Sequence, residues 1–494
     1  MPAKTKSSPI IIEQQYTKYM EKGRDFINDD LIWEQLKSQV KPDPQLVRDL
    51  IAKSLDIQTL QPEETAALLN VDDPQLWEEM SEAAGKIKRK VYDNRIVFFA
   101  PLYCSNYCIN NCLYCSFRKD YQQETRRRLS MEEIKAEIEV LAGKMGHKRL
   151  ISVYGEHPKS DARYIAKTLE TIYSMKVPTR KGFGEIRRVN INAAPMSIQD
   201  FKLLKEVGIG TYQVFHETYH HQTYNQVHPQ GTIKNNYPWR LYTHHRALEA
   251  GVDDVALGVL FGLYHWRFEV MGLVYHALEL ENKFGGIGPH TISFPRLQPA
   301  AGAPLTENSQ YKVSDEDFKK LIVVIRLSVP YTGMILTARE PADIRKEVIP
   351  LGVTQTDAST RIGLGAYSES YNQQEVNRQQ FLLGDTREMD EVIRELAEMG
   401  YITSFCTAGY RCGRTGDHIM KLLKCGKEGH FCKINAILTY REWLDDFASE
   451  QTREVGEKLI VKEIQEVKQQ MPQVYDTMMK YYHRISKGER DLYF

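Results

Sequence analysis

The sequence has no excess of charge of either sign and no long hydrophobic run. Lys and Arg number 65, and so do Asp and Glu, which gives no reason to expect general attraction to nucleic acid or to an anionic membrane. The longest conspicuous apolar run, VALGVLFGLY at 255–264, is too short and too rich in glycine to cross a bilayer. The first 20 residues contain no apolar segment of signal-peptide length. We therefore expect a soluble, cytoplasmic protein without a membrane or nucleic-acid partner.

Cysteine is scarce as well, and its distribution is uneven. Only eight of the 494 residues are cysteine, yet four of them lie together in the segment PLYCSNYCINNCLYCSF, at positions 104, 108, 112 and 115. Disulfide frameworks are typical of small secreted chains whose cysteines are dispersed. A large cytosolic chain with a local group of cysteines instead indicates a metal site or an iron–sulfur cluster.

Three of these cysteines have a spacing that suits a 4Fe–4S cluster. Cys108, Cys112 and Cys115 form the pattern C-x3-C-x2-C. Such a cluster usually takes four thiolates, so three ligands from one loop leave one iron open for a chelating substrate or cofactor. Cys104 is not needed by this spacing, and we expect it to be a buried neutral thiol. A structural zinc loop is the alternative, although zinc usually takes four ligands from two paired knuckles.

The alternation of short β-branched or aromatic segments with amphipathic helices predicts an α/β fold with a (β/α)8 TIM-type barrel. An N-terminal helical extension is expected over 1–90, the barrel over 91–370 and a mostly helical C-terminal domain over 371–494. A helix opened by a capping box of Ser130 and Glu133 is predicted after the cysteine segment. The eight candidate strands are 95–102, 149–156, 188–194, 211–217, 254–262, 290–296, 333–340 and 361–368.

The cysteine loop directly follows the first candidate strand. In a parallel barrel the loops after the strands carry the chemistry, at the carboxyl ends of the strands. This position indicates a functional site rather than a structural one. A zwitterionic ligand at a barrel mouth would need a planar, bidentate partner for its carboxylate, and a guanidinium supplies that geometry. We assign this role to Arg296, at the end of the sixth strand, with Ser293 as a second donor. The alternative for Arg296 is a structural pair with an acidic neighbour.

The pattern C-x3-C-x-aromatic-C after the first strand resembles the radical S-adenosylmethionine (SAM) superfamily, with Tyr114 at the aromatic position. The resemblance implies that SAM chelates the open iron, that one electron from the cluster cleaves it, and that the resulting 5′-deoxyadenosyl radical abstracts a hydrogen. It further implies that Cys108, Cys112 and Cys115 serve catalysis as cluster ligands. The residues that the resemblance places against SAM are Tyr114, Gly155, Glu156, Glu217 and Arg240. For Glu217 the alternative is an ordinary ion pair with a nearby arginine.

Longer segments are similar to the aromatic amino acid lyase branch of that superfamily. The hydrogenase-maturation tyrosine lyases (HydG) match best, and the thiazole-pathway tyrosine lyases (ThiH) come next. For such enzymes the resemblance implies cleavage of the Cα–Cβ bond of L-tyrosine to p-cresol and dehydroglycine, with an electron donor and, for HydG, other hydrogenase maturation proteins as partners. The segments that carry this similarity are GIGTYQVFHETYH, GVDDVALGVLFGLY, GPHTISFPRLQPAAGAP and GVTQTDASTRIGLGAYS.

The sequence departs from HydG where that family carries a second cluster, which converts dehydroglycine to carbon monoxide and cyanide. The family signature is C-x2-C followed by x22-C. Here Cys406 and Cys432 occupy the first and third positions, but Gly409 occupies the second, and glycine has no ligand. Cys412 and Cys425 lie nearby in the sequence, although their use demands a different loop path. A normal second cluster is therefore not expected; a labile cluster, a zinc site and no metal stay open.

Tyrosine cleavage thus has stronger support than hydrogenase maturation, because the motifs of the barrel are intact. Two other functions stay open. One is a 2-iminoacetate synthase of thiazole and thiamine synthesis, which carries out the same cleavage. The other is a non-enzymatic iron–sulfur scaffold, which would need neither SAM nor a substrate pocket. Polar residues at several strand ends, such as Glu156 and Glu217, speak against a scaffold.

Overall fold

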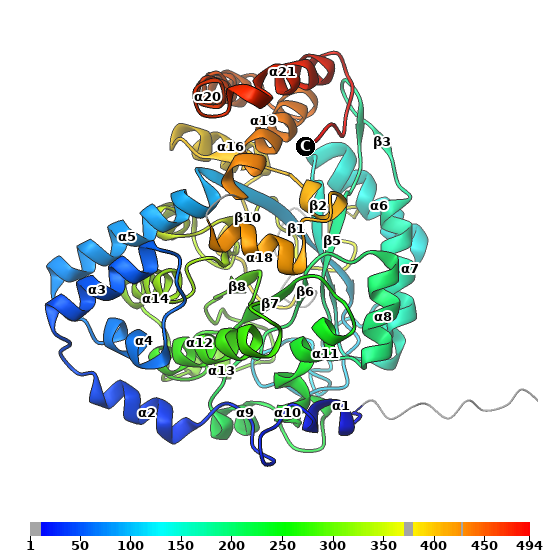
Figure 1. Ribbon diagram of the computed structural model, residues 1–494. Coiled ribbons are helices and arrows are strands. Elements are labelled where there is room, and N and C mark those ends of the chain that lie inside the picture. Colours follow the sequence, from blue (N-terminus) through cyan, green and yellow to red (C-terminus); the bar gives the residue numbers. More distant parts are fainter. Residues whose placement is uncertain (1–10, 370–378, 426–427) are drawn as a thin grey trace, which may run out of the picture.

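A computed structural model of the chain describes residues 11–369, 379–425 and 428–494 (Figure 1). The expected domain boundary at 370/371 lies outside the described residues. Residues 1–10, the first half of the N-terminal segment considered above, lie outside them as well. Among the described helices, none combines the length and the apolar character that a membrane crossing requires.

Five helices precede the first strand, in agreement with the predicted helical extension. Aspartates cap two of them: Asp43 accepts a hydrogen bond from Gln45 N, and Asp73 accepts from Gln75 N and Leu76 N. A proline follows each aspartate at the first helical position, where its missing N–H costs nothing. The helices are α1 (Gln14–Thr17), α2 (Asp29–Ser38), α3 (Pro44–Leu55), α4 (Pro62–Leu69) and α5 (Pro74–Tyr92).

Eight parallel strands form the predicted barrel. The sheet order runs from β10 down to β5 and then through β2 and β1, and β1 also pairs with β10, which closes the barrel. Two short strands, β3 (Val177–Pro178) and β4 (Phe183–Gly184), form a separate antiparallel hairpin between β2 and β5. The barrel strands are β1 (Arg95–Ser105), β2 (Arg149–Tyr154), β5 (Arg188–Asn192), β6 (Tyr212–Gln213), β7 (Val255–Gly258), β8 (Thr291–Ser293), β9 (Gly333–Leu336) and β10 (Gln355–Asp357).

The eighth strand is not where the sequence pattern placed it. The predicted strand 361–368 consists mainly of turns, with an isolated bridge from Gly363 to Gln379, and the barrel is closed by β10 instead. β10 escapes a hydrophobic-pattern search because its side chains are polar and bonded within the barrel. Thr356 Oγ1 donates to Leu336 O, and Asp357 Oδ1 accepts from Ala338 N at 2.7 Å.

Helices cover the outside of the barrel, as predicted. The capping box before α6 is present: Glu133 N donates to Ser130 Oγ, and Ser130 N donates to the Glu133 carboxylate. Helix α6 continues into a π-helical turn, Leu141–Met145, and ends at Gly146 with a φ of 84°. The helices of this layer are α6 (Met131–Val140), α7 (Ala162–Tyr173), α8 (Ile198–Val207), α9 (His221–Val227), α10 (Tyr237–Leu241), α11 (Thr243–Glu249), α12 (Trp266–Lys283), α13 (Leu305–Asn308), α14 (Asp315–Ser328) and α15 (Ala342–Val348).

The C-terminal region joins the barrel through a ninth strand, β11 (Ile402–Ser404). It pairs with Arg95–Val97, the amino end of β1, so it lies at the end of the barrel opposite the cysteine loop. In Figure 1 helices α19 to α21 lie at the top, whereas α1, α9 and α10 lie at the bottom. The helices of this region are α16 (Met389–Glu398), α17 (Ala408–Arg411), α18 (Gly416–Lys424), α19 (Glu428–Asp446), α20 (Glu450–Gln470) and α21 (Pro472–Ser486).

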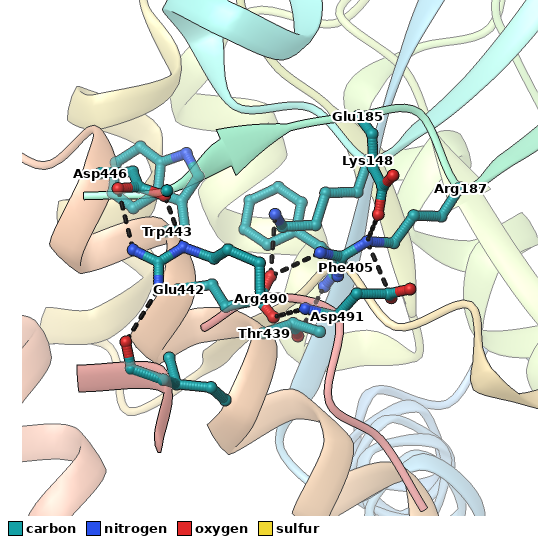
Figure 2. Close-up of polar contacts among 12 residues, drawn as sticks. Lys148, Glu185, Arg187, Phe405, Thr439, Glu442, Trp443, Asp446, Arg490 and Asp491 are labelled. Carbon is teal, nitrogen blue, oxygen red and sulfur yellow. Dashed lines mark hydrogen bonds and ion pairs between the residues drawn. The ribbon is translucent and has the colours of Figure 1, made fainter. Parts of the chain in front are cut away.

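A buried ion network fixes α19 against the amino ends of the barrel strands (Figure 2). Glu442, on α19, accepts hydrogen bonds at 2.9 Å from both Lys148, just before β2, and Arg187, just before β5. Nearby, Arg490 pairs with Asp446 at 2.7 Å. Because two cations share one buried carboxylate, the pKa of Glu442 falls to about 2 in spite of its burial, which by itself raises the pKa.

Candidate active site

A cavity of about 210 Å³ opens at the carboxyl ends of the barrel strands; we call it the mouth cavity. The cysteine loop after β1 lines one part of it, and the ends of β2, β5 and β6 continue the wall. Ser293, Thr337 and Asp357, at the ends of β8, β9 and β10, line the other part. Three apolar side chains, Phe99, Ile151 and Ile335, pack together within the barrel and also line this cavity. The cavity lies where the topology predicts the chemistry.

Cys108, Cys112 and Cys115 all line the mouth cavity. Their loop is held by its backbone, because Ile109 N donates to Glu156 O at 2.9 Å and Leu113 N donates to Val227 O at 3.0 Å. Burial raises the pKa of Cys108 to about 12 and that of Cys115 to about 11. In the metal-free protein these thiols hold their protons, and metal binding must displace them.

Cys104 lies elsewhere, in agreement with the sequence interpretation. It is fully buried in the hydrophobic core within β1, and its thiol contacts Leu102 O at 3.5 Å. Burial raises its pKa to about 12. In the part of the chain that the structure describes, no three His, Cys, Asp or Glu side chains come close enough together to hold a single metal ion. Three cysteines around an open cavity suit a 4Fe–4S cluster, whose thiolates bind separate irons.

Gly155 and Glu156 follow β2 and contact the cysteine loop. Gly155 N donates to Ser105 O at 2.8 Å, and a Cβ on Gly155 would stand only 2.3 Å from Tyr107 O. Glu156 Oε2 accepts from Asn110 Nδ2, but its buried Oε1 has no hydrogen-bond partner in the described residues. Burial raises the pKa of Glu156. An unpaired carboxylate oxygen on the cavity wall fits the amino group of an amino-acid cofactor such as SAM.

Glu217 lines the cavity after β6 with a strained backbone, at a φ of 80°. Its Oε1 accepts from Lys234 Nζ at 2.7 Å and from Arg240 Nη2 at 3.2 Å. Burial opposes ionisation, but the two cations lower the pKa of Glu217 below its usual value. The ion pair with an arginine, which the sequence left open, is present. Lys234 was missed in the sequence, since it lies in a single 3-10 turn, Ile233–Asn235, without a motif.

Tyr114 also lines the cavity, beside the cysteines. Its hydroxyl is hydrogen-bonded to His228 Nε2 at 2.7 Å, and the other ring nitrogen of His228 faces Tyr224 O at 2.9 Å. If His228 Nδ1 carries the proton that the carbonyl accepts, Nε2 accepts from the Tyr114 hydroxyl. The ring of Tyr114 is thereby fixed on the cavity wall, where it offers an apolar face.

Arg296 does not line the mouth cavity. Its guanidinium is paired with Glu340, through Nε at 3.0 Å and through Nη2, and with Asp315 at 2.7 Å. This is the structural pairing that the sequence interpretation kept as the alternative. Ser293 does line the cavity, and its Oγ is buried without a hydrogen-bond partner in the described residues.

Arg339, unlike Arg296, brings a guanidinium to the mouth cavity. It follows β9 and lines the mouth cavity, with its guanidinium 3.3 Å from the centre of the Phe381 ring. Within the described residues its guanidinium makes no hydrogen bond or ion pair. Burial lowers its pKa below the usual range. The available signal was its place at the end of a predicted strand, in the segment TARE at 337–340.

A second, smaller cavity of about 70 Å³ lies at the amino ends of the strands; we call it the basal cavity. Cys406, Gly409 and Cys432 all line it. Cys412 and Cys425 do not: both are exposed, and their thiols contact Phe494 O and Leu422 O. The two cavities share no lining residue. The structure thus brings together the three positions of the C-x2-C-x22-C signature but not the two spare cysteines.

Two family models match the chain, the Radical SAM superfamily over residues 102–269 and the Biotin and Thiamin Synthesis associated domain over 293–402. The 2-iminoacetate synthase of Salmonella typhimurium is 30% identical over 353 residues, which cover 71% of this chain and 88% of that protein.

Solved structures give closer matches. A crystal structure of HydG, a maturase of the [FeFe]-hydrogenase, is 46% identical, with a TM-score of 0.90 over 95% of this chain and all of that one. The HydG of Carboxydothermus hydrogenoformans is 36% identical, with a TM-score of 0.76 over 92% of this chain and 97% of that one. Together with the cysteine-lined cavity, these matches show that the chain is a radical SAM enzyme and belongs to the group that includes HydG and the 2-iminoacetate synthases.

Proposed function

We propose that this enzyme cleaves the Cα–Cβ bond of L-tyrosine to p-cresol and dehydroglycine. Cys108, Cys112 and Cys115 would hold a 4Fe–4S cluster, and SAM would bind at its open iron, with Glu156, Glu217 and Arg240 around it. When bound and reduced by an electron donor, this pair supplies a carbon radical that abstracts a hydrogen from the substrate. The similarity to HydG and to 2-iminoacetate synthase supports this reaction class.

The observation that carries the substrate assignment is the unpaired guanidinium of Arg339 on the cavity wall. A free amino acid brings a carboxylate, and a guanidinium binds it through two parallel hydrogen bonds. Ser293 Oγ and Thr337 Oγ1 are buried on the same wall without partners in the described residues. Each can donate to that carboxylate or accept from a neighbouring group of the ligand.

The apolar part of the cavity suits the aromatic side chain of the substrate. Phe99, Ile151 and Ile335 form a buried apolar group on the wall. Contact with them removes the ring from water, which favours tyrosine over small or charged amino acids. The same burial keeps water away from the reacting atoms, which limits side reactions of a radical.

Hydrogenase maturation is the finer proposal, and the overall similarity to HydG supports it. Other maturation proteins would then be partners, but conversion of dehydroglycine to carbon monoxide and cyanide would need a second cluster, for which Gly409 supplies no ligand. A 2-iminoacetate synthase is the second candidate, supported by 30% identity over most of that protein. A pure iron–sulfur scaffold is disfavoured, because the chain is a radical SAM enzyme by its family match.

The test is p-cresol formation after anaerobic reconstitution with iron and sulfide, in the presence of SAM, a reductant and tyrosine. We expect p-cresol from the unaltered enzyme and none from Cys112→Ala, which removes a cluster ligand. Cys104→Ala is the matched control, because Cys104 lies in the core away from the cavity, and it should keep the activity. Formation of 5′-deoxyadenosine without p-cresol would retain radical chemistry but overturn tyrosine as the substrate.

A further inference from the structure

The basal cavity has the position and the wall of a cluster site but lacks one ligand. Cys406 is buried just after β11, and Cys432 is buried on α19. Gly409, on the short helix α17, lines the cavity with them. Two thiolates fall one short of the three that the C-x2-C-x22-C signature supplies, and three is also the number that the cysteine loop supplies to the mouth cavity. Among the described residues, the lining of the basal cavity therefore does not fit the second cluster that the similarity to HydG implies.

The rest of the cavity wall still suits an anionic iron–sulfur cluster bound through cysteine sulfur. Ala408 N donates to Cys406 Sγ at 3.4 Å, and such hydrogen bonds stabilise thiolate sulfur. Arg95, Arg149 and Arg414 line the cavity together with one carboxylate, Asp254, so that positive charge predominates on its wall. Thr407 Oγ1 is buried on the wall and has no hydrogen-bond partner in the described residues. The proposed tyrosine cleavage takes place in the mouth cavity and uses none of these features.

The backbone at Gly409 accepts a side chain. Its φ is not positive, so an L residue is not strained there. Of the described residues, a Cβ on Gly409 would meet Arg414 O alone, at 3.3 Å, which a shift of a few tenths of an ångström relieves. Neither spare cysteine can replace this position, because Cys412 and Cys425 are exposed and outside the cavity.

We propose that the natural chain carries a single iron–sulfur cluster, and that Gly409 alone is responsible: the substitution Gly409→Cys completes a three-cysteine site in the basal cavity. The consequence for dehydroglycine rests on the proposed function, because this product forms only if the mouth cavity cleaves tyrosine. Dehydroglycine then leaves this enzyme without conversion at a second cluster, and a separate catalyst must consume it.

The experiment counts iron and acid-labile sulfide per chain after anaerobic reconstitution of the full-length protein. We expect about four irons for the natural chain and about eight for Gly409→Cys. The same substitution in a Cys108→Ala, Cys112→Ala, Cys115→Ala background isolates the basal site. There the count should rise from near zero to about four, and the reduced protein should gain an electron paramagnetic resonance signal.

Gly409→Ser is the matched control, because it adds a side chain of similar size without a thiolate. It should leave the iron count unchanged, as should Cys412→Ser and Cys425→Ser. Cys432→Ser should abolish the gain in Gly409→Cys. About four irons in the triple-alanine variant with Gly409 intact would overturn the proposal, and so would a folded Gly409→Cys chain without extra iron. None of these counts depends on tyrosine cleavage, so this proposal and the substrate assignment fail separately.

Discussion

Two arginines at the ends of neighbouring strands differ in their surroundings rather than in their own chemistry. Arg296 follows β8 and is neutralised by Glu340 and Asp315. Arg339 follows β9, lines the mouth cavity and makes no ion pair within the described residues. A guanidinium already paired with two carboxylates has few N–H donors left for a third. Arg296 therefore has a structural role, and Arg339 keeps its donors for a ligand carboxylate.

We expect Arg339→Gln to lower kcat/KM for tyrosine about 10- to 100-fold, mainly through a higher KM. The reason is the loss of one of the two charged hydrogen bonds to the substrate carboxylate, worth about 1.5–3 kcal/mol, because the Gln amide can still donate one hydrogen bond. The measurement is initial rates of p-cresol formation over a range of tyrosine concentrations. Arg296→Gln is the comparison: it leaves the buried Glu340 unpaired and should lower thermal stability instead of raising KM. A KM increase confined to Arg296→Gln would restore the assignment that the sequence suggested.

Single residues were predictable where spacing alone carries the chemistry. Cys108, Cys112 and Cys115 could be selected because three thiolates in one loop have few other uses. The choice between Arg296 and Arg339 could not be made, since it depends on Glu340, which comes from the next strand and is adjacent only in the fold. Lys234 was unpredictable for the same reason: its contact with Glu217 depends on how the short 3-10 helix Ile233–Asn235 packs against the end of β6.

At the scale of elements, the turn after β2 and the cysteine loop are packed backbone against backbone. We expect Gly155→Ala to reduce iron incorporation and to destabilise the protein by about 1–3 kcal/mol, because its Cβ would stand 2.3 Å from the rigid Tyr107 O. Iron per chain and the midpoint of thermal unfolding are the measurements. Gly85→Ala, in the middle of α5 and remote from the cavity, should leave the iron count unchanged. Full iron loading in Gly155→Ala would show that the loop adapts without loss.

Elements with strong local signals were predicted, and those defined by the tertiary structure were not. The helix after the cysteine loop was predictable from Ser130 and Glu133, because their reciprocal hydrogen bonds form between residues close in sequence. The eighth strand was misplaced because β10 consists of Gln355, Thr356 and Asp357, which are polar yet buried. The interior of the barrel makes such a strand stable, and this environment cannot be read from the strand itself.

At the scale of the whole molecule, the network of Figure 2 connects the C-terminal helices to the barrel. We expect Glu442→Gln to destabilise the protein by about 3–5 kcal/mol, because it leaves Lys148 and Arg187 buried without their shared carboxylate. Urea unfolding followed by circular dichroism measures the effect. Glu82→Gln breaks an exposed pair with Lys86 and should change stability by less than about 0.5 kcal/mol. Equal effects of the two substitutions would contradict the structural role of the network.

The same carboxylate predicts a pH dependence. The pKa of Glu442 is about 2 in the folded protein, below the usual value near 4.5, so its ionised form stabilises the fold. That contribution is complete above about pH 4.5 and is lost as the pH falls toward 2. We expect the stability difference between the natural chain and Glu442→Gln to shrink steadily between pH 4.5 and pH 3. A constant difference over this range, measured in urea, would show that Glu442 does not carry the effect.

The separation of the two cavities could not have been predicted from the sequence. Cys406 follows a strand, as the cysteine loop does, which by the barrel rule suggests the mouth. β11, however, pairs with the amino end of β1 and directs Cys406 to the opposite end. Strand order and register are tertiary properties, and a three-residue strand carries too little pattern to specify them.

Strand β1 is hydrogen-bonded along its whole length: β11 and β10 pair with its amino half, and β2 pairs with its carboxyl half as far as Ser105. Amides held in this way exchange with deuterium only when a large part of the protein opens. Cys108, the first of the three proposed cluster ligands, lies three residues after the end of this strand. The thiols are therefore anchored to what we expect to be among the slowest-exchanging segments of the chain, so little ordering entropy is left to be lost when iron arrives.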